Sequence, residues 1–180
     1  MRIGLTLITT VCISLISNAG KAQNTENGQQ PIDSMEHENI ITGKTTLEEL
    51  NGISEFWDEY TVHYADCSPN EEILKQLLIH LQTHEIHIIA VIGTWCGDTK
   101  EQFPVLQKII EQIHHHNLTL EYIGVDRDKL AGSEDISSLG IEFVPTFIFY
   151  EKGKELGRIV EIPQGTMEEN MLAIFNKNKQ

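Results

Sequence analysis

Apolar residues recur along most of the chain with periods that alternate between strand and helix. Ile86–Ile92 is an almost continuous apolar and β-branched run, which predicts a central strand covered on both faces. Leu118–Val125 and Phe143–Tyr150 predict two further buried strands, and Glu155–Ile162 predicts the last one. Thr61–Ala65 is expected to form a short first strand.

Segments with helical periodicity separate these strands. Apolar positions spaced three and four residues apart predict helices over four segments, one beginning near Ser68-Pro69, one containing Phe103 to Ile113, one over Ser133–Leu139 and one over Met167–Phe175. The alternation predicts an α/β fold with a central mixed sheet and helices on both faces. Most strands of this sheet are expected to be parallel, and the last two are expected to form an antiparallel hairpin joined through residues 151–154.

The first residues have the composition of a targeting segment. Arg2, the apolar run Ile3–Ile16 and the small residues that end at Ala22 are typical of a secretory signal peptide over residues 1–22. The run is shorter than the ~20 apolar residues of a membrane-spanning helix. We therefore expect an exported protein, periplasmic or secreted, with no stable membrane insertion after cleavage of the signal peptide.

Residues 23–60 are expected to be a flexible, acidic and polar leader that contains one short helical segment. Thr46 and Glu49 fit a capping box, and the aromatic residues that follow at helical spacing form one apolar face. A Gly52 break interrupts this segment. The main domain is predicted to cover residues 61–180.

Composition and charge narrow the possible partners. The chain has 180 residues, 40% of them hydrophobic, which is a globular value. It carries 13 Lys and Arg against 27 Asp and Glu, a formal net charge of −14 that argues against binding to nucleic acid. The 8 His residues contain no HExxH motif or similar ligand spacing, so we expect neither a metal site nor a cofactor.

The candidate chemistry lies in the loop after the central strand, at Gly93–Lys100. Parallel strands of α/β folds place ligands at this end. Cys96 is expected at the N-terminus of the next helix, where free N–H groups and the helix dipole favour a thiolate. The alternative is a buried cysteine that packs as a small apolar residue.

Several short motifs agree in order and spacing with these elements: Trp95–Lys100 (WCGDTK), Pro104, Gly140-Ile141, Val144-Pro145-Thr146 and Lys152–Glu155. Together they resemble the thioredoxin family pattern WCGPCK…P…GI…PT…F..G, over about residues 61–176. The resemblance implies a thioredoxin fold in which Pro145 is cis and faces Cys96. It also implies a substrate-binding surface made by Trp95, Gly97, Asp98, Val144, Pro145 and Thr146, where the Val144 backbone pairs with an extended substrate.

Three departures from the family pattern limit the activity that the resemblance implies. Thr99 replaces the second cysteine of the motif, so a disulfide within the motif cannot form. Ala90 occupies the position of the buried acid that accepts a proton in the second step. Asp98 replaces a proline and places a negative charge that opposes thiolate formation near the sulfur.

The remaining chemistry is that of one cysteine, with Cys96 as nucleophile and Thr99 as a hydroxyl donor to its thiolate. Cys12 leaves with the signal peptide. Cys67, at the end of the expected first strand, is expected ~9–10 Å from Cys96, beyond the ~7 Å Cα limit of a disulfide.

The sequence thus predicts an exported, monothiol thiol-disulfide oxidoreductase of isomerase or deglutathionylating type. Its partners are protein or small-molecule thiols and disulfides, and an external thiol must resolve the mixed disulfide. The alternative is a redox-inactive thioredoxin-fold module that binds peptides. A peroxidase is a third hypothesis, which we rank last.

Overall fold

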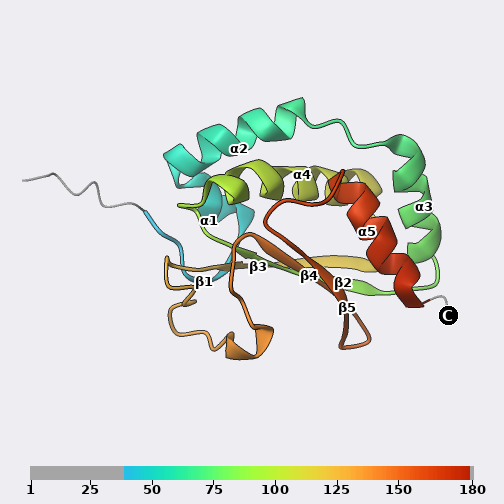
Figure 1. The fold of residues 1–180 in the computed structure, drawn as a ribbon. Helices are drawn as coiled ribbons and strands as arrows, with labels where there is room; N and C mark the ends of the chain where they lie inside the picture. The colour runs from blue at the N-terminus through green and yellow to red at the C-terminus, as the bar shows by residue number, and fades with distance from the viewer. Residues whose placement is uncertain (1–38, 179–180) are drawn as a thin grey trace, which may run out of the picture. The chain divides into compact units, whose positions relative to one another are not determined.

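A mixed sheet of five strands organises the part of the chain that the structure describes. The computed structural model describes residues 39–178, so the predicted signal peptide, Cys12 and residues 23–38 of the predicted leader lie outside it. The strands are β1 (Gly43–Thr45), β2 (Ile86–Ile92), β3 (Leu118–Gly124), β4 (Thr146–Glu151) and β5 (Lys154–Val160). Their order is β1-β3-β2-β4-β5 (Figure 1). Only the β2–β3 pair is parallel, and the other three neighbouring pairs are antiparallel.

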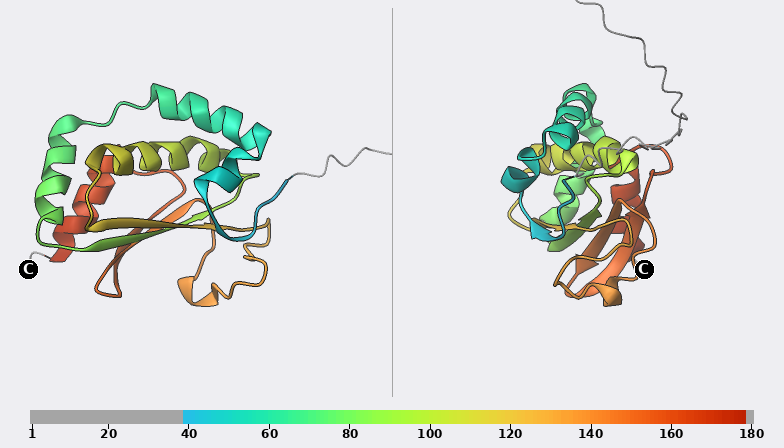
Figure 2. Two further views of the ribbon diagram at one scale, coloured as in Figure 1. Left: turned by 180° about the vertical axis from the view of Figure 1, so that it is seen from behind. Right: turned by 90° about the vertical axis from the view of Figure 1, so that its left-hand side faces the viewer.

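The helices are distributed unevenly over the two faces of this sheet. They are α1 (Leu47–Asn51), α2 (Ser54–Asp66), α3 (Glu71–Leu81), α4 (Gly97–Ile113) and α5 (Met167–Phe175), with 3-10 helices η1 (Ser137–Leu139) and η2 (Asn176–Asn178). The views in Figures 1 and 2 agree that α2, α3, α4 and α5 lie over one face, and that η1 lies beyond the other. The second face is therefore covered mainly by the irregular segment 125–145.

Strand β2 is buried on both sides, as its apolar run predicts. Ile88, Ala90 and Ile92 belong to the main core beneath the helices. Val91 points to the other face and packs in a smaller core with residues of the 125–145 segment, among them Val125 and Ala131. Because a shift by one residue would exchange these two sets, the burial of β2 fixes its register.

Helices α2 and α3, which precede β2, pack on α4, and α1 packs on α2. The predicted capping box is present at the start of α1, where the Glu49 N–H donates to Thr46 Oγ1 over 3.2 Å and the Thr46 N–H donates to Glu49 Oε2 over 2.9 Å. Gly52 then separates α1 from α2. On α2, Phe56 and Tyr60 face α4 and contact Phe103, with ring centroids 6.4 and 5.8 Å apart.

The prediction of a strand at Thr61–Ala65 is wrong, because these residues are the last turns of α2. The aromatic spacing that starts at Phe56 continues through Tyr60 to Tyr64, and this face stays packed on α4. Lys108 of α4 supports the end of α2, since its Nζ donates to the carbonyl oxygens of Tyr64 and Cys67 over 2.7 and 2.6 Å.

Two further elements differ from the sequence predictions. The helix expected over Ser133–Leu139 is only the 3-10 turn of η1, preceded by a tight turn in which Ala131 bridges Glu134. Helix α3 begins after Asn70, whose side chain accepts the N–H groups of Glu72 and Ile73, so Pro69 precedes the helix instead of opening it. Within residues 39–178, no helix has the length and apolar character needed to cross a membrane.

Truncating Phe103 tests the packing of α2 on α4. Its side chain is 0% exposed, so Phe103→Ala removes a ring from the main core, and we expect a loss of ~3–5 kcal/mol in the free energy of unfolding. The control is Val62→Ala on the outer side of α2, where the side chain is 57% exposed and the expected change is within ~0.5 kcal/mol. Urea denaturation measures both. Equal effects of the two substitutions would contradict this packing.

Candidate active site

Cys96 lies at the end of β2, where the loop turns into α4. Its backbone is extended and it is the N-cap residue of α4, as the sequence predicts. Its N–H donates to Gly93 O over 2.9 Å, which closes the turn, and its thiol donates to Val144 O over 3.1 Å. The thiol is half-buried, and the first N–H groups of α4 lie beside it.

The register between β2 and β4 brings the two parts of the site together. Val91 pairs with Thr146, so the residues after β2 meet the residues before β4. The Val144–Pro145 peptide bond is cis, and both residues are buried. Thr146 is also buried, and its hydroxyl donates to Phe143 O over 2.7 Å, which fixes the turn that contains Pro145.

Trp95 is held on three sides. Its indole Nε1 donates to Val125 O over 2.9 Å, and the guanidinium carbon of Arg127 lies 4.9 Å from the ring centroid. The ring also covers Gly93, where a Cβ would come within 2.7 Å of Trp95 Cε2. A glycine is therefore required two residues before this tryptophan.

Thr99 makes a contact that the sequence did not predict. Its side chain is 0% exposed, and its Oγ1 accepts the Gly93 N–H over 3.3 Å. The structure shows no hydrogen bond between these two described side chains, Thr99 and Cys96, although both stand at the start of α4. The expected donation from Thr99 to the thiolate therefore remains a prediction.

The other predicted residues of this loop differ in exposure. Gly97 is exposed, and a Cβ there would meet nothing within 4 Å. Asp98 is half-buried in the first turn of α4, where a carboxylate is favourable for the helix. Lys100 is buried and binds Glu59 and Glu55 of α2 at 2.8 and 3.6 Å, and the hydrogen bond to Glu59 raises its pKa. Its charge is thus directed to α2.

Cys67 does not join this site. It caps the end of α2 rather than a strand, and its carbonyl oxygen binds Lys108, about three turns or ~18 Å along α4 from Cys96. Both cysteines are free thiols. Burial raises the pKa of the Cys67 thiol, while Lys108 lowers it and Glu168 raises it further.

Arg158, to which sequence reasoning assigned no role, fastens the segment that precedes Pro145. Its Nη1 donates to Leu139 O over 2.9 Å, and its Nε and Nη2 each donate to the Glu155 carboxylate over 2.7 Å. A lone arginine in a strand gives no signal of this contact, because Leu139 is distant in sequence.

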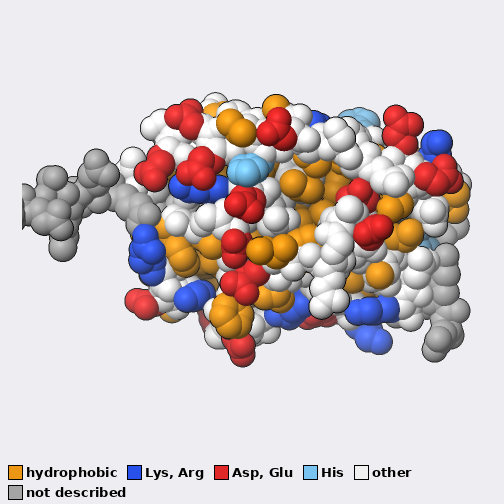
Figure 3. Space-filling view, turned by 45° about the horizontal axis from the view of Figure 1, so that its top comes forward, with side chains coloured by type: hydrophobic (Ala, Val, Ile, Leu, Met, Phe, Trp, Pro, Cys, Tyr) orange, Lys and Arg blue, Asp and Glu red, His pale blue; other side chains and the backbone are white. Residues whose placement is uncertain are grey.

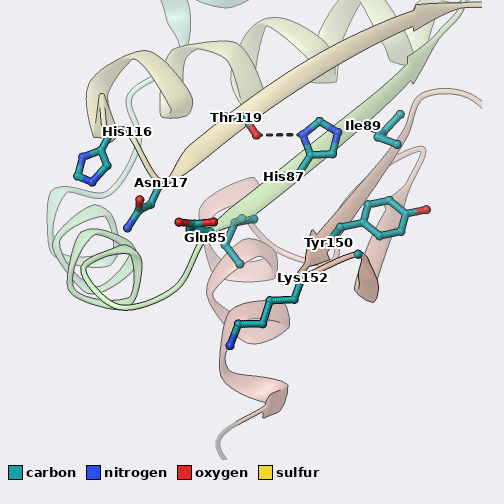
Figure 4. Close-up of a pocket in the computed structure, with 10 residues that line it drawn as sticks. Glu85, His87, Ile89, His116, Asn117, Thr119, Tyr150 and Lys152 are labelled. Atoms are coloured by element: carbon teal, nitrogen blue, oxygen red, sulfur yellow. Dashed lines mark hydrogen bonds between the residues drawn. The ribbon is translucent and has the colours of Figure 1, made fainter.

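A separate cavity of about 650 Å³ lies at the opposite end of β2, near residues 85–87. Figure 4 shows side chains from β2, β3 and β4 around it, with a His87 ring nitrogen hydrogen-bonded to Thr119 Oγ1 at 2.9 Å. In residues 39–178, no three His, Cys, Asp or Glu side chains form a group that could hold a metal ion.

Comparison with known proteins identifies the family to which the chain belongs. A family model described as Thioredoxin matches residues 43–175. The chain belongs to the thioredoxin family. It is 34% identical to Thioredoxin-2 of Dictyostelium discoideum over 89 residues, which are 49% of this chain and 89% of that protein.

Two further similarities extend over more of the chain. The mitochondrial Thioredoxin-2 of Schizosaccharomyces pombe is 28% identical over 120 residues, 67% of this chain and 72% of that protein. A crystal structure of a protein of unknown function from Pseudomonas aeruginosa covers 75% of this chain and 85% of its own, at 16% identity and a TM-score of 0.49. Membership of the thioredoxin family supports a thiol-disulfide oxidoreductase type of function, with thiols or disulfides as substrates.

Gly93→Ala tests the packing of the Trp95 indole on Gly93. The new Cβ would clash with the indole, so we expect displacement of Trp95, loss of its bond to Val125 and ~1–3 kcal/mol lower stability. Fluorescence of Trp95 in a Trp57→Phe background reports the displacement. Gly97→Ala is the matched control, with open space around the new methyl group. An unchanged Trp95 spectrum in Gly93→Ala would contradict this arrangement.

The Arg158–Glu155 pair predicts a pH dependence of stability. The hydrogen bond from Arg158 lowers the pKa of the Glu155 carboxyl below its ordinary value. A lowered pKa means that the carboxylate stabilises the folded state above that value and loses this contribution as the pH falls through the folded-state pKa. Between about pH 5 and 3, we therefore expect the free energy of unfolding to fall more steeply in the wild type than in Glu155→Gln.

Urea denaturation at a series of pH values measures this difference. Glu72→Gln serves as a control with the same change of charge, because Glu72 is exposed and its pair with Lys75 at 3.5 Å lies at the surface. The control should keep the slope of the wild type. If Glu155→Gln keeps it as well, the bond to Arg158 contributes nothing to folding.

Proposed function

We propose that the protein is an exported thiol-disulfide oxidoreductase that works through Cys96 alone. The observation that carries the proposal is the isolation of this thiol. Thr99 takes the place of a second cysteine one turn along α4, and Cys67 lies about three turns away. The pattern of residues 1–22 supports export, to the periplasm or outside the cell.

The exchange needs a single nucleophile. Cys96 loses its proton to solvent, and its Sγ attacks one sulfur of a client disulfide. A bond forms between the two sulfurs, the client S–S bond breaks, and the departing sulfur leaves with the electron pair and takes up a proton. Cys96 is the N-cap residue of α4, so the unpaired N–H groups at the start of that helix lie beside the attacking sulfur.

Release of the client requires a second thiol from outside the protein. An external thiolate attacks the mixed disulfide at the client sulfur, and Cys96 leaves as the thiolate that starts the next cycle. When the attacking thiol belongs to the client itself, the same step rearranges the client disulfide. When Cys96 has instead taken a small thiol from the client in the first exchange, this step releases that thiol from Cys96 as a disulfide with the external thiol. Isomerase and deglutathionylating chemistry therefore share this site.

The backbone around Pro145 supports binding of an extended client. Val144 O lies 3.1 Å from the Cys96 sulfur, so a peptide that pairs with Val144 would bring its own sulfur beside the nucleophile. Trp95 and the exposed Phe143 provide apolar surface on either side. Trp95, Gly97, Asp98, Val144, Pro145 and Thr146 form the surface that we assign to the client.

Trapping a mixed disulfide tests this mechanism. The full chain is mixed with glutathione disulfide or a disulfide-bonded peptide, and intact mass spectrometry follows the adduct. We expect an adduct on Cys96 that persists until a free thiol is added. It should be lost in Cys96→Ser and retained in Cys67→Ser. Peptide binding that survives Cys96→Ser, without any adduct in the wild type, would favour a redox-inactive binding module.

Thr99→Cys provides the matched variant. Residue 99 lies one turn after Cys96 on the same helix, so a thiol there can attack the mixed disulfide from within. We expect the adduct of this variant to disappear without added thiol, by at least tenfold faster decay than in the wild type. Equal decay in both proteins would show that another group resolves the wild-type adduct.

A further inference from the structure

The order of the strands determines which charged residues lie on each side of Cys96 at this edge of the sheet, which we call the reactive edge. The ends of β3 and β2, the start of β4 and the end of β5 lie side by side in that sequence. Arg127 therefore stands on the β3 side of Cys96, and Pro145 and Glu161 follow on the other side. The guanidinium group of Arg127 lies over the Trp95 ring.

Glu161 is fixed directly beside Pro145. Its N–H donates to Pro145 O over 2.7 Å, and its backbone is left-handed, with φ of 53°. This conformation favours glycine, yet the position carries a carboxylate. Among the residues that the structure describes, no hydrogen bond or ion pair engages that carboxylate.

Glu142 adds a second carboxylate on the same side, and within residues 39–178 it too has no hydrogen bond or ion pair. It is exposed and stands two residues before Val144, whose carbonyl oxygen accepts the Cys96 thiol. Each of these acids is followed by an exposed apolar side chain, Phe143 at 51% and Ile162 at 60%. The two strand ends that flank Pro145 thus present the same pair, a carboxylate and then a large apolar group.

Nearby basic side chains do not neutralise these acids. Lys100 is bound by Glu59 and Glu55, and Arg158 is bound by Glu155 and Leu139 O. Lys129 lines one cavity with Glu142, but its Nζ donates to Arg127 O over 2.9 Å. The chain as a whole carries a net charge of −14, and acidic side chains lie among apolar and basic ones on the face shown in Figure 3. The potential on the Pro145 side of the thiol is therefore negative.

We propose that Glu142 and Glu161 make the site select clients with a lysine or arginine beside the reacting cysteine. The inference rests on the single-cysteine exchange proposed above and adds the class of substrate. A basic client gains attraction to both carboxylates while its neighbouring apolar residues cover Phe143 and Ile162. An anionic client, including a small acidic thiol adduct, is disfavoured by the same charges.

Three synthetic peptides of equal length test this selectivity. Each carries one cysteine as its 2-pyridyl disulfide, flanked on both sides by Lys, by Ser or by Glu. Attack by Cys96 joins its sulfur to the peptide sulfur and releases pyridine-2-thione, whose absorbance gives the rate. Rates of the Cys96→Ser chain are subtracted to remove the contributions of the other cysteines.

We expect the Lys peptide to react at least ~10-fold faster than the Glu peptide at low ionic strength, with the Ser peptide between them. Near 1 M salt the ratio should fall towards one, because charges at the surface are then screened beyond ~3 Å. In Glu142→Gln/Glu161→Gln the ratio at low salt should fall to about two- to threefold.

Matched variants separate local charge from net charge and from backbone strain. Glu71→Gln/Glu85→Gln makes the same change of net charge at exposed positions away from Cys96, and it should keep the wild-type ratio. Glu161→Gly removes the carboxylate and suits the left-handed backbone, so it should lower the ratio while raising the melting temperature. Glu161→Gln should lower the ratio without that rise.

The results distinguish the two proposals. Reaction of all three peptides at equal rates, or an equal loss of selectivity in the remote double variant, would overturn the role of Glu142 and Glu161 and leave the exchange at Cys96 intact. If none of the peptides reacts faster with the wild type than with Cys96→Ser, the proposed function itself fails.

Discussion

The antiparallel pairing of β2 with β4 is the interaction on which the site depends. It sets Val91 opposite Thr146, so the loop that carries Cys96 meets the turn that carries Pro145. Because β2 is buried on both faces, a slip in register would move its apolar side chains out of both cores. The 3.1 Å contact between the Cys96 thiol and Val144 O is thus a consequence of core packing.

The helices that precede β2 stabilise the other half of the site. Helix α2 packs on α4 through its aromatic face, and Glu59 and Glu55 hold the ammonium group of Lys100 in the first turns of α4. Lys100 is 10% exposed, so its charge is largely removed from water and would be costly without these partners. The N-terminus of α4 is therefore tied to α2, and the N–H groups that face Cys96 are held in place by a segment outside the sheet.

Much of this arrangement was predictable because it depends on local pattern. Continuous burial identified β2, helical spacing identified α4 and α5, and a capping box identified the start of α1. Thr61–Ala65 was misassigned because a short alternating segment also fits a helix whose aromatic face packs on a neighbour, and only α4 decides between the two. Arg158 and Glu161 act through Leu139 O and Pro145 O, contacts set by tertiary structure, so their residue types carried no signal. The predicted position of Cys67 was wrong for the same reason, because Cys67 lies at the end of a helix and not at the end of a strand.

The replacement at residue 99 changes the loop as well as its chemistry. The Gly93 carbonyl accepts the Cys96 N–H, and the Gly93 N–H donates to Thr99 Oγ1. Both backbone groups of Gly93 are therefore hydrogen-bonded, one to the turn and the other to a side chain of α4. The indole of Trp95 then covers Gly93 and bonds to Val125 O. A thiol at position 99 would be a weak acceptor for the Gly93 N–H and would compete for the bound sulfur. The hydroxyl instead secures the loop and is not a nucleophile toward a disulfide, so the thiol that the described residues present at this edge is that of Cys96, as the proposed single-cysteine exchange requires.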